Sequence, residues 1–359
     1  MTDLLYSETE DDLRAAVRSL LADRADPQTL LGRIETPAPY VPGLWKALGG
    51  EIGAAGLLVP EKLGGQGASH REAAVVLEEL GRAVTPAPYL TSAVIATETL
   101  LALDTESGPV AELLAGLAAG RTVAVLALPL SADPDAESPA TGTVTGVADA
   151  VAADVFLVPR ADGLYAVPAA EATVAPQTPL DLTRPLAAVT TDGTGGTRLA
   201  DSAAAARTAI GRGLLAGAGL LASEQLGLAE WCLEETVRHT RSRYQFNRPV
   251  GSFQALKHRM AQLWLEVVNA RAAARAAADA LATGDPEARL TVAVAQAYCS
   301  KVAVHAAEEC VQLHGGIGMT WEHPAHLALK RAKSDQIALG SAGRHQDAIA
   351  ALVGLSAPA

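Results

Sequence analysis

Cysteines and long apolar runs are scarce in this sequence. Its 359 residues include only three cysteines, and no two of them have the Cys-x-x-Cys spacing of zinc or redox sites: Cys232, Cys299 and Cys310. We therefore expect buried thiols of a cytoplasmic protein and no metal centre. No apolar run approaches the roughly 20 residues that cross a bilayer, and the acidic segment MTDLLYSETEDDLRAA is unlike a signal peptide.

Basic residues are outnumbered by acidic ones. The chain has 28 Lys and Arg against 40 Asp and Glu, a formal net charge of −12 at pH 7. This balance argues against nucleic acid or an anionic membrane surface as a partner. It still allows an anionic ligand that is held by a few local arginines. The length predicts two or three domains, and the hydrophobic content of 49% is typical of a globular protein with a large core.

Three regions differ in the spacing of their apolar residues. Residues 1–120 show helical spacing, with a capping-box pattern at Ser69 and Glu72. Residues 121–197 contain short Val- and Ala-rich runs between Pro, Asp and Gly, which predict antiparallel strands. The rest of the chain, 198–359, has long amphipathic runs at 201–246, 253–284, 285–315 and 323–355. We predict a mostly α-helical fold with a reduced antiparallel β-domain inserted between a helical domain and a four-helix bundle.

The segment RSRYQFNRPVGSFQALKHRMAQL contains the first candidate site. Arg243, Gln245 and Phe246 stand at a predicted helix end, before an Asn-Arg-Pro turn and a new helix. A guanidinium binds phosphate or carboxylate through paired hydrogen bonds, and a phenyl ring packs against a planar ligand. The same residues also suit a positively charged helix end followed by a turn. The residues alone do not separate these two interpretations.

The segment CVQLHGGIGMTWEHP contains the second candidate site. Gly315 and Gly316 follow a predicted helix, and glycine permits a positive φ and the close approach of a ligand. Gln312, one turn earlier, can donate and accept hydrogen bonds at the same place. Taken alone, this pattern is also typical of an ordinary helix C-cap followed by a loop.

Together, the two segments resemble the acyl-CoA dehydrogenase family of flavoproteins. RYQFNRPVGSFQ is similar to the family's R-x-x-F-G-x-P-I-x-x-F-Q element, with Asn247 in place of glycine. QLHGGIG is similar to its Q-x-x-G-G-x-G element, and LEELGRAVTPAP resembles its first domain. The resemblance covers nearly the whole chain. It implies an all-α N-terminal domain, a middle β-domain and a C-terminal four-helix bundle, which is the predicted order.

The resemblance also implies a cofactor. In this family the bundle residues bind the FAD of the neighbouring subunit around its adenosine and pyrophosphate. By position, the resemblance assigns FAD binding to Arg243, Gln245, Phe246, Gln312, Gly315, Gly316 and Ser341.

A catalytic base is absent at the expected positions. Family members remove the α-proton of an acyl-CoA with a carboxylate while the β-carbon delivers hydride to the flavin. In many members the base is the Glu of a Y-E-G-T-S stretch, and Leu339 takes its place here. Some relatives carry the base on an earlier helix, at a position that falls near Gly217. Glu224 lies two turns away and is expected to be structural. Losing a general base typically costs about 10²–10⁴-fold in rate.

The β region departs from the family as well. The flavin-lining strands T-E-P…G-S-D and W-I-T/S correspond here to ALPLSADPD and to GTVTGVADAVAADV, which has no Trp. The chain thus resembles the non-catalytic subunit of actinobacterial α₂β₂ acyl-CoA dehydrogenases that act on steroid side-chain CoA thioesters. The segment TPLDLTRPLAAV is also similar to that group. This resemblance implies a partner subunit that supplies the Glu, the flavin-facing β-domain and the acyl-CoA pocket. Two alternatives stay open: a homo-oligomeric relative with other chemistry, and a non-catalytic binder.

Three weaker patterns favour structural roles. GRGLLAG, residues 211–217, predicts close helix packing because it lies within a helical pattern. His323 and His326 have HxxH spacing but no third ligand type nearby, which favours surface or cap roles over a metal. Trp231 and Trp264 have helical spacing and are expected in the core.

Overall fold

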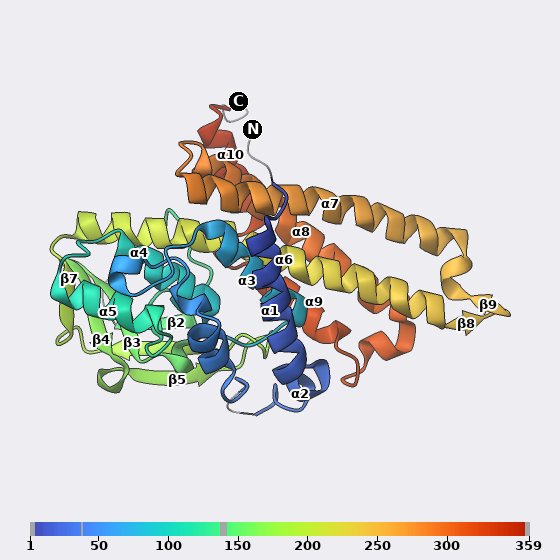
Figure 1. Cartoon of the computed structure of the whole chain (residues 1–359), viewed down its shortest axis with the longest axis horizontal. Coiled ribbons are helices and arrows are strands. Elements are labelled where there is room, and N and C mark those ends of the chain that lie inside the picture. The colour runs from blue at the N-terminus through green and yellow to red at the C-terminus, as the bar shows by residue number, and fades with distance from the viewer. Residues whose placement is uncertain (1–3, 37–38, 137–141, 356–359) are drawn as a thin grey trace.

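A helical region, a β region and a bundle of long helices follow one another along the chain (Figure 1). The computed structural model describes residues 4–36, 39–136 and 142–355. The β region lies at one end of the molecule, and the long helices extend from it towards the other end. Within the described ranges, no helix combines the length and the apolar character needed to cross a membrane. The domain limits at 120 and 197 stay predictions.

The first region is helical, as predicted. Its helices are α1 (Glu8–Arg24), α2 (Pro27–Leu31), α3 (His70–Ala83), α4 (Thr97–Leu101) and α5 (Gly108–Ala118). The predicted capping box begins α3: Ser69 Oγ accepts the Arg71 N–H at 3.1 Å, and the Glu72 carboxylate accepts the Ser69 N–H at 2.8 Å. Within this region a π-helical stretch, Tyr89–Ala96, continues directly into α4.

The β region forms two small sheets, with strand orders β1-β3-β4-β7 and β2-β6-β5. The strands are β1 (Ala124–Leu126), β2 (Gly142–Ala148), β3 (Val155–Arg160), β4 (Gly163–Pro168), β5 (Thr173–Gln177), β6 (Leu186–Thr191) and β7 (Thr197–Ala200). The antiparallel prediction is wrong for β1 and β3, which pair in parallel. The strand between them in the chain, β2, belongs to the second sheet, so the chain returns to the first sheet in the same direction. The sequence did not predict β7, which is too short to show alternation.

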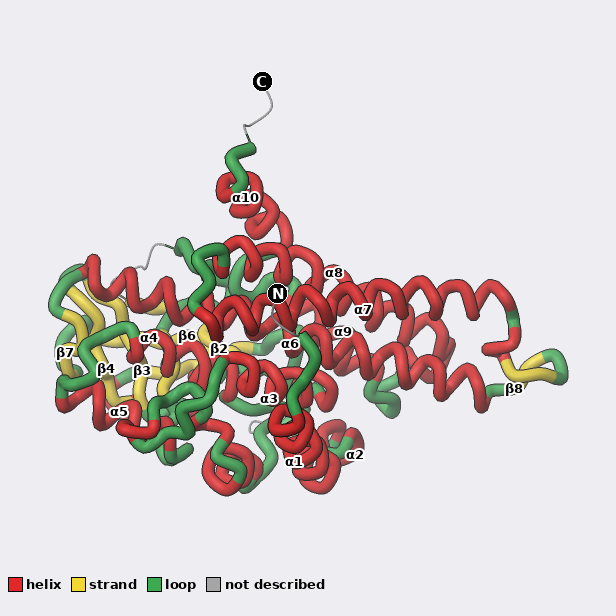
Figure 2. Tube along the Cα trace, turned by 45° about the horizontal axis from the view of Figure 1, so that its top comes forward, coloured by secondary structure: helices red, strands yellow, loops and turns green. Residues whose placement is uncertain are grey.

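The bundle is built around α6 (Ala203–Ser242), which packs against α3, α7 (Gln254–Thr283) and α8 (Ala288–His314). The predicted fourth long helix is wrong. It is divided into α9 (Ala325–Asp335) and α10 (Ala342–Leu352), and α10 packs against α8 but runs in a different direction from the long helices (Figure 2). Between them, Leu339 and Gly340 have φ values of 52° and 98°, which a right-handed helix does not allow.

A short hairpin joins α6 to α7. The strands β8 (Tyr244–Gln245) and β9 (Arg248–Pro249) pair antiparallel, although the sequence predicted helix as far as residue 246. Phe246 and Asn247 form the two-residue turn, with φ values of 54° and 61°. Two positive φ values in succession are the mark of a type I′ hairpin turn, and asparagine adopts this conformation more readily than most residues. The turn therefore accommodates Asn247 where the family has glycine.

Small residues on α6 bring two helices close together, as the GRGLLAG pattern predicted. A Cβ added at Gly213 would lie 2.1 Å from Thr99 Oγ1 and 2.6 Å from the carbonyl oxygen of Ile95. Since no real side chain tolerates such distances, glycine here sets the spacing between α6 and α4.

The predicted burial of cysteine is confirmed, and that of tryptophan is confirmed only in part. Cys232, Cys299 and Cys310 are all buried and free. Trp231 packs against the main core, whereas Trp264 on α7 is 55% exposed, so the prediction for Trp264 is wrong. Helical spacing shows that residues share a face, but it does not show which face is covered.

Candidate cofactor-binding site

The two positions at which the family carries its base lie side by side. A Cβ added at Gly217 would lie 3.2 Å from Leu339 Cδ1 and 2.6 Å from Ile95 Cγ1. Leu339 is 1% exposed. The long α6 and the break after α9 therefore bring both positions to one buried point. Neither of them carries a carboxylate, and the apolar side chains around them fill the space.

The segment that corresponds to the flavin-lining strand closes over this point. The Leu339 N–H donates to the carbonyl oxygen of Leu130 at 2.7 Å. A Cβ added at Gly340 would lie 3.0 Å from Asp133 Cβ. The cavity that remains has a volume of about 30 Å³, and its lining is apolar apart from Thr91. Such a volume holds about two water molecules. Among the described residues, this space is smaller than an isoalloxazine ring.

Glu224 is fully engaged in a buried ion cluster, which confirms its structural interpretation. Arg331 Nη1 donates to Glu224 Oε1 at 2.5 Å, and Arg184 donates to the same oxygen. Arg331 Nε also donates to Asp181 Oδ2 at 2.5 Å. Glu224 is 2% exposed. Both guanidiniums bond to this buried carboxylate, which therefore ties the β region to the bundle.

The hairpin at the other end of α6 is exposed. Arg243, Tyr244, Gln245 and Phe246 are open to solvent, and Phe246 is 86% exposed. Arg248 stacks its guanidinium 3.9 Å from the centroid of the Phe253 ring, and the ring of Phe246 meets Phe253 edge-on. The hairpin thus presents cationic, amide and aromatic groups together, which is the chemistry that a nucleotide with a pyrophosphate requires.

The second segment lies at the same end of the bundle. Gln312 is exposed in the last turn of α8, and Gly315 follows it with φ +63° and ψ −137°. A Cβ added at Gly315 or Gly316 would meet no atom of the described residues within 4 Å. His314 connects this segment to the hairpin end of α6, because its ring lies 4.2 Å from that of His239. The structure therefore brings the two candidate segments, residues 243–246 and 312–316, together at one open end of the bundle. These two segments are hereafter called the bundle edge.

Ser341 is separate from the bundle edge. It is the N-cap of α10, where its Oγ accepts the Arg344 N–H at 3.4 Å. In both views α10 lies far from the hairpin (Figures 1 and 2). Ser341 thus lies two residues after Leu339 and caps α10.

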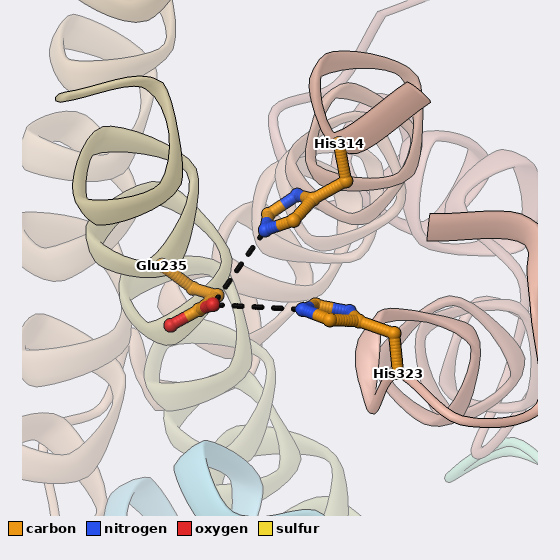
Figure 3. Close-up of side chains that lie close together, drawn as sticks. All are labelled: Glu235, His314 and His323. Carbon is orange, nitrogen blue, oxygen red and sulfur yellow. Dashed lines mark ion pairs between the residues drawn. The ribbon is translucent and has the colours of Figure 1, made fainter. Parts of the chain in front are cut away.

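A cluster of ligand-type side chains was missed from the sequence. Glu235 and His314 lie beside His323, so the statement that His323 has no third ligand type nearby is wrong (Figure 3). The cap role is confirmed, because His323 Nδ1 accepts the Ala325 N–H at the start of α9 at 3.2 Å. Glu235 and His323 are far apart along the chain, and no local spacing could indicate this contact.

Comparison with known proteins decides the family. The pattern of the acyl-CoA dehydrogenase N-terminal domain matches residues 7–120, and that of the C-terminal domain matches residues 206–354. The acyl-CoA dehydrogenase IpdE2 of Mycolicibacterium smegmatis is 36% identical over 334 residues, which cover 93% of this chain and 95% of the relative. The chain belongs to the acyl-CoA dehydrogenase family. The predicted fold class is thereby confirmed, and FAD is the cofactor of this family of oxidoreductases.

Further relatives within the family cover the chain equally well. IpdE2 of Mycobacterium tuberculosis is 39% identical over 90% of this chain and 91% of its own. Among solved structures, a chain of the ChsE4-ChsE5 complex from Mycobacterium tuberculosis has a TM-score of 0.86, 25% identity and full coverage of both chains. A variant of the steroid ACAD Tcur3481-Tcur3483 has a TM-score of 0.84 and 25% identity over 97% of this chain and 98% of its own.

Proposed function

We propose that this chain is the non-catalytic subunit of a heteromeric, FAD-dependent acyl-CoA dehydrogenase. In this proposal it contributes its bundle edge to an FAD held mainly by a catalytic partner subunit, and the partner supplies the glutamate that removes the α-proton. The observation that carries the proposal is the contrast between two places in one chain. Around Leu339 the space is small and apolar, whereas the bundle edge is open and carries the residues to which the family resemblance assigns FAD binding.

Each residue of the bundle edge has a definite task in this proposal. The Arg243 guanidinium would pair with the pyrophosphate, and the amides of Gln245 and Gln312 would donate to the adenosine half. The Phe246 ring would pack against the nucleotide, and the missing side chains at Gly315 and Gly316 would let it approach the backbone. When bound, FAD supplies the electron acceptor of the reaction. Ser341 would have no part in this shared site, since it lies beside Leu339.

The solved relatives support a heteromeric assembly and a steroid substrate. One of them is a complex of two named chains, ChsE4 and ChsE5, and another is described as a steroid ACAD. We therefore propose an α₂β₂ assembly in the cytoplasm with a steroid side-chain CoA thioester as its substrate. In such an assembly, two of the four sites would lack one shared wall. The space gained would accommodate a bulky, ring-bearing substrate.

Co-expression with a partner chain that carries the missing glutamate tests the proposal. We expect this chain alone to be colourless and inactive, and the co-purified pair to be yellow and active with about one FAD per heterodimer. R243A in this chain should lower FAD retention in the complex at least about tenfold, because a charge-assisted hydrogen bond to phosphate is lost. R241A is the matched control, since Arg241 is an exposed arginine of the same helix end outside the motif. A yellow, active homotetramer of this chain alone would contradict the proposal.

A further inference from the structure

We propose that Glu235, His314 and His323 form a binding site for a divalent metal ion of the zinc class (Figure 3). The three side chains come from α6, from the end of α8 and from the loop before α9. His314 Nε2 lies 3.5 Å from Glu235 Oε1, and His323 Nε2 lies 3.6 Å from the same oxygen. All three ligand atoms lie within 4.8 Å of one another. Neighbouring ligands of a tetrahedral zinc ion are about 3.4 Å apart, given metal–ligand bonds of about 2.1 Å.

His314 is already oriented as a metal ligand. Its Nδ1 is bonded to the Cys310 carbonyl oxygen at 2.6 Å, which requires the proton to be on Nδ1 and leaves Nε2 to face Glu235. Metal-bound histidines characteristically make such a bond through their other nitrogen. The side chain of His314 is fully buried, and among the described residues its Nε2 has no hydrogen-bond partner. A buried polar atom without a partner is costly, and an ion at this point would satisfy it.

A negative charge faces the ring nitrogens of the cluster. The Glu235 carboxylate lies opposite the Nε2 atoms of both His314 and His323 and also accepts a hydrogen bond from Arg238 Nε at 2.8 Å. The rings of His239 and His323 flank that of His314, with centroids 4.2 Å and 4.4 Å away. A carboxylate and two imidazole nitrogens that face one another are the donor set that zinc and similar divalent ions prefer.

Binding requires two small rearrangements. His323 must move its proton from Nε2 to Nδ1 and therefore give up the hydrogen bond from the Ala325 N–H. Arg238, whose side chain is 70% exposed, must withdraw from Glu235 Oε1, where the ion replaces it as the counter-charge. Three protein ligands leave a fourth position for water. The ion would tie α6, α8 and the loop after Gly316 together directly behind the bundle edge.

Zinc binding to the full-length chain tests the site. After dialysis with Zn²⁺ and removal of loose metal, we expect one ion per chain, and Co²⁺ should give the absorption of a tetrahedral complex. E235Q and H323Q should each weaken Zn²⁺ binding by at least about tenfold. Even the loss of a residue that only orients a metal ligand typically lowers metal affinity by about tenfold or more, and the loss of a ligand should cost at least as much. Because H314Q alters a buried residue, it is informative only if thermal unfolding shows that it folds.

His305 and Glu266 provide the matched control. They form a partly exposed His–carboxylate pair, with 2.7 Å between His305 Nδ1 and Glu266 Oε2, and this pair lacks the second histidine of the cluster. H305Q should therefore leave Zn²⁺ binding unchanged. Retention of less than a stoichiometric amount of zinc by the native chain would overturn the inference. Equal affinity of the native chain and the folded E235Q and H323Q variants would overturn it as well, because the ion would then lie elsewhere.

Discussion

At the scale of single residues, Leu339 is part of the buried apolar core. It contacts the place of the alternative base at Gly217, and its backbone is bonded to Leu130. Its φ of 52° is unusual for leucine, and the contacts around it hold this backbone conformation. We therefore expect that a carboxylate placed here would not by itself give a reaction.

The variant L339E makes this argument testable. The new carboxylate would lie in an apolar cavity of about 30 Å³ without a cationic partner. We expect the free energy of unfolding to fall by about 3 kcal/mol or more, and the isolated chain to stay inactive. The control L339M conserves volume and should cost less than about 1.5 kcal/mol. Denaturant unfolding and an acyl-CoA turnover assay measure both effects. Turnover by L339E without a partner subunit would show that the site is intact after all.

At the scale of elements, the sequence predicted those helices and turns that are determined by neighbouring residues, and it failed where contacts between distant residues determine the backbone. The helices α1 and α3 have apolar periodicity and side-chain caps, and both signals are local. The break between α9 and α10 and the hairpin after α6 depend on positive φ values at Leu339, Phe246 and Asn247. Leucine and phenylalanine seldom adopt this conformation, so neither residue indicated a turn. Tertiary contacts hold these residues there, and propensity does not report such contacts.

Asn247 allows the hairpin to be tested as a positioning element for the bundle edge. N247V places a β-branched residue at a φ of 61°, which costs about 1–2 kcal/mol and should distort the turn that carries Phe246. N247G, which introduces the family's residue, should leave the turn intact. We expect the complex with N247V to retain several-fold less FAD than the complex with N247G, at equal subunit stoichiometry. Equal FAD content in the two complexes would mean that the hairpin conformation has no role in binding.

At the scale of the whole molecule, the site could be predicted only where it consists of short segments. The RYQFNRPVGSFQ and QLHGGIG elements identified the bundle edge because each one is local. The closed site could not be derived in the same way. Its contacts join Ile95, Leu130, Gly217 and Leu339, which are far apart in sequence and give no spacing signal. The same is true of the buried ion cluster that joins the β region to the bundle through Asp181, Arg184, Glu224, Arg331 and Asp335.

This ion cluster gives the fold a specific dependence on pH. Burial, followed by repulsion from Glu224, raises the pKa of Asp335 from its ordinary 3.8 to about 8 in the folded chain. Below about pH 4 both the folded and the unfolded chain hold this proton. Between about pH 4 and pH 8 only the folded chain holds it, so the free energy of unfolding falls as the pH rises. Above pH 8 the contribution of Asp335 no longer changes.

The variant D335N isolates this contribution, because an amide cannot ionise. We expect the stability of D335N relative to the native chain to increase steadily from about pH 5 to about pH 8, as the native chain loses the advantage of its buried proton. D347N removes an exposed carboxylate from α10 and should follow the native chain throughout. Denaturant unfolding at several pH values measures the three proteins side by side. A constant difference between D335N and the native chain would mean that Asp335 is already ionised in the fold, held there by Arg184 and Arg331.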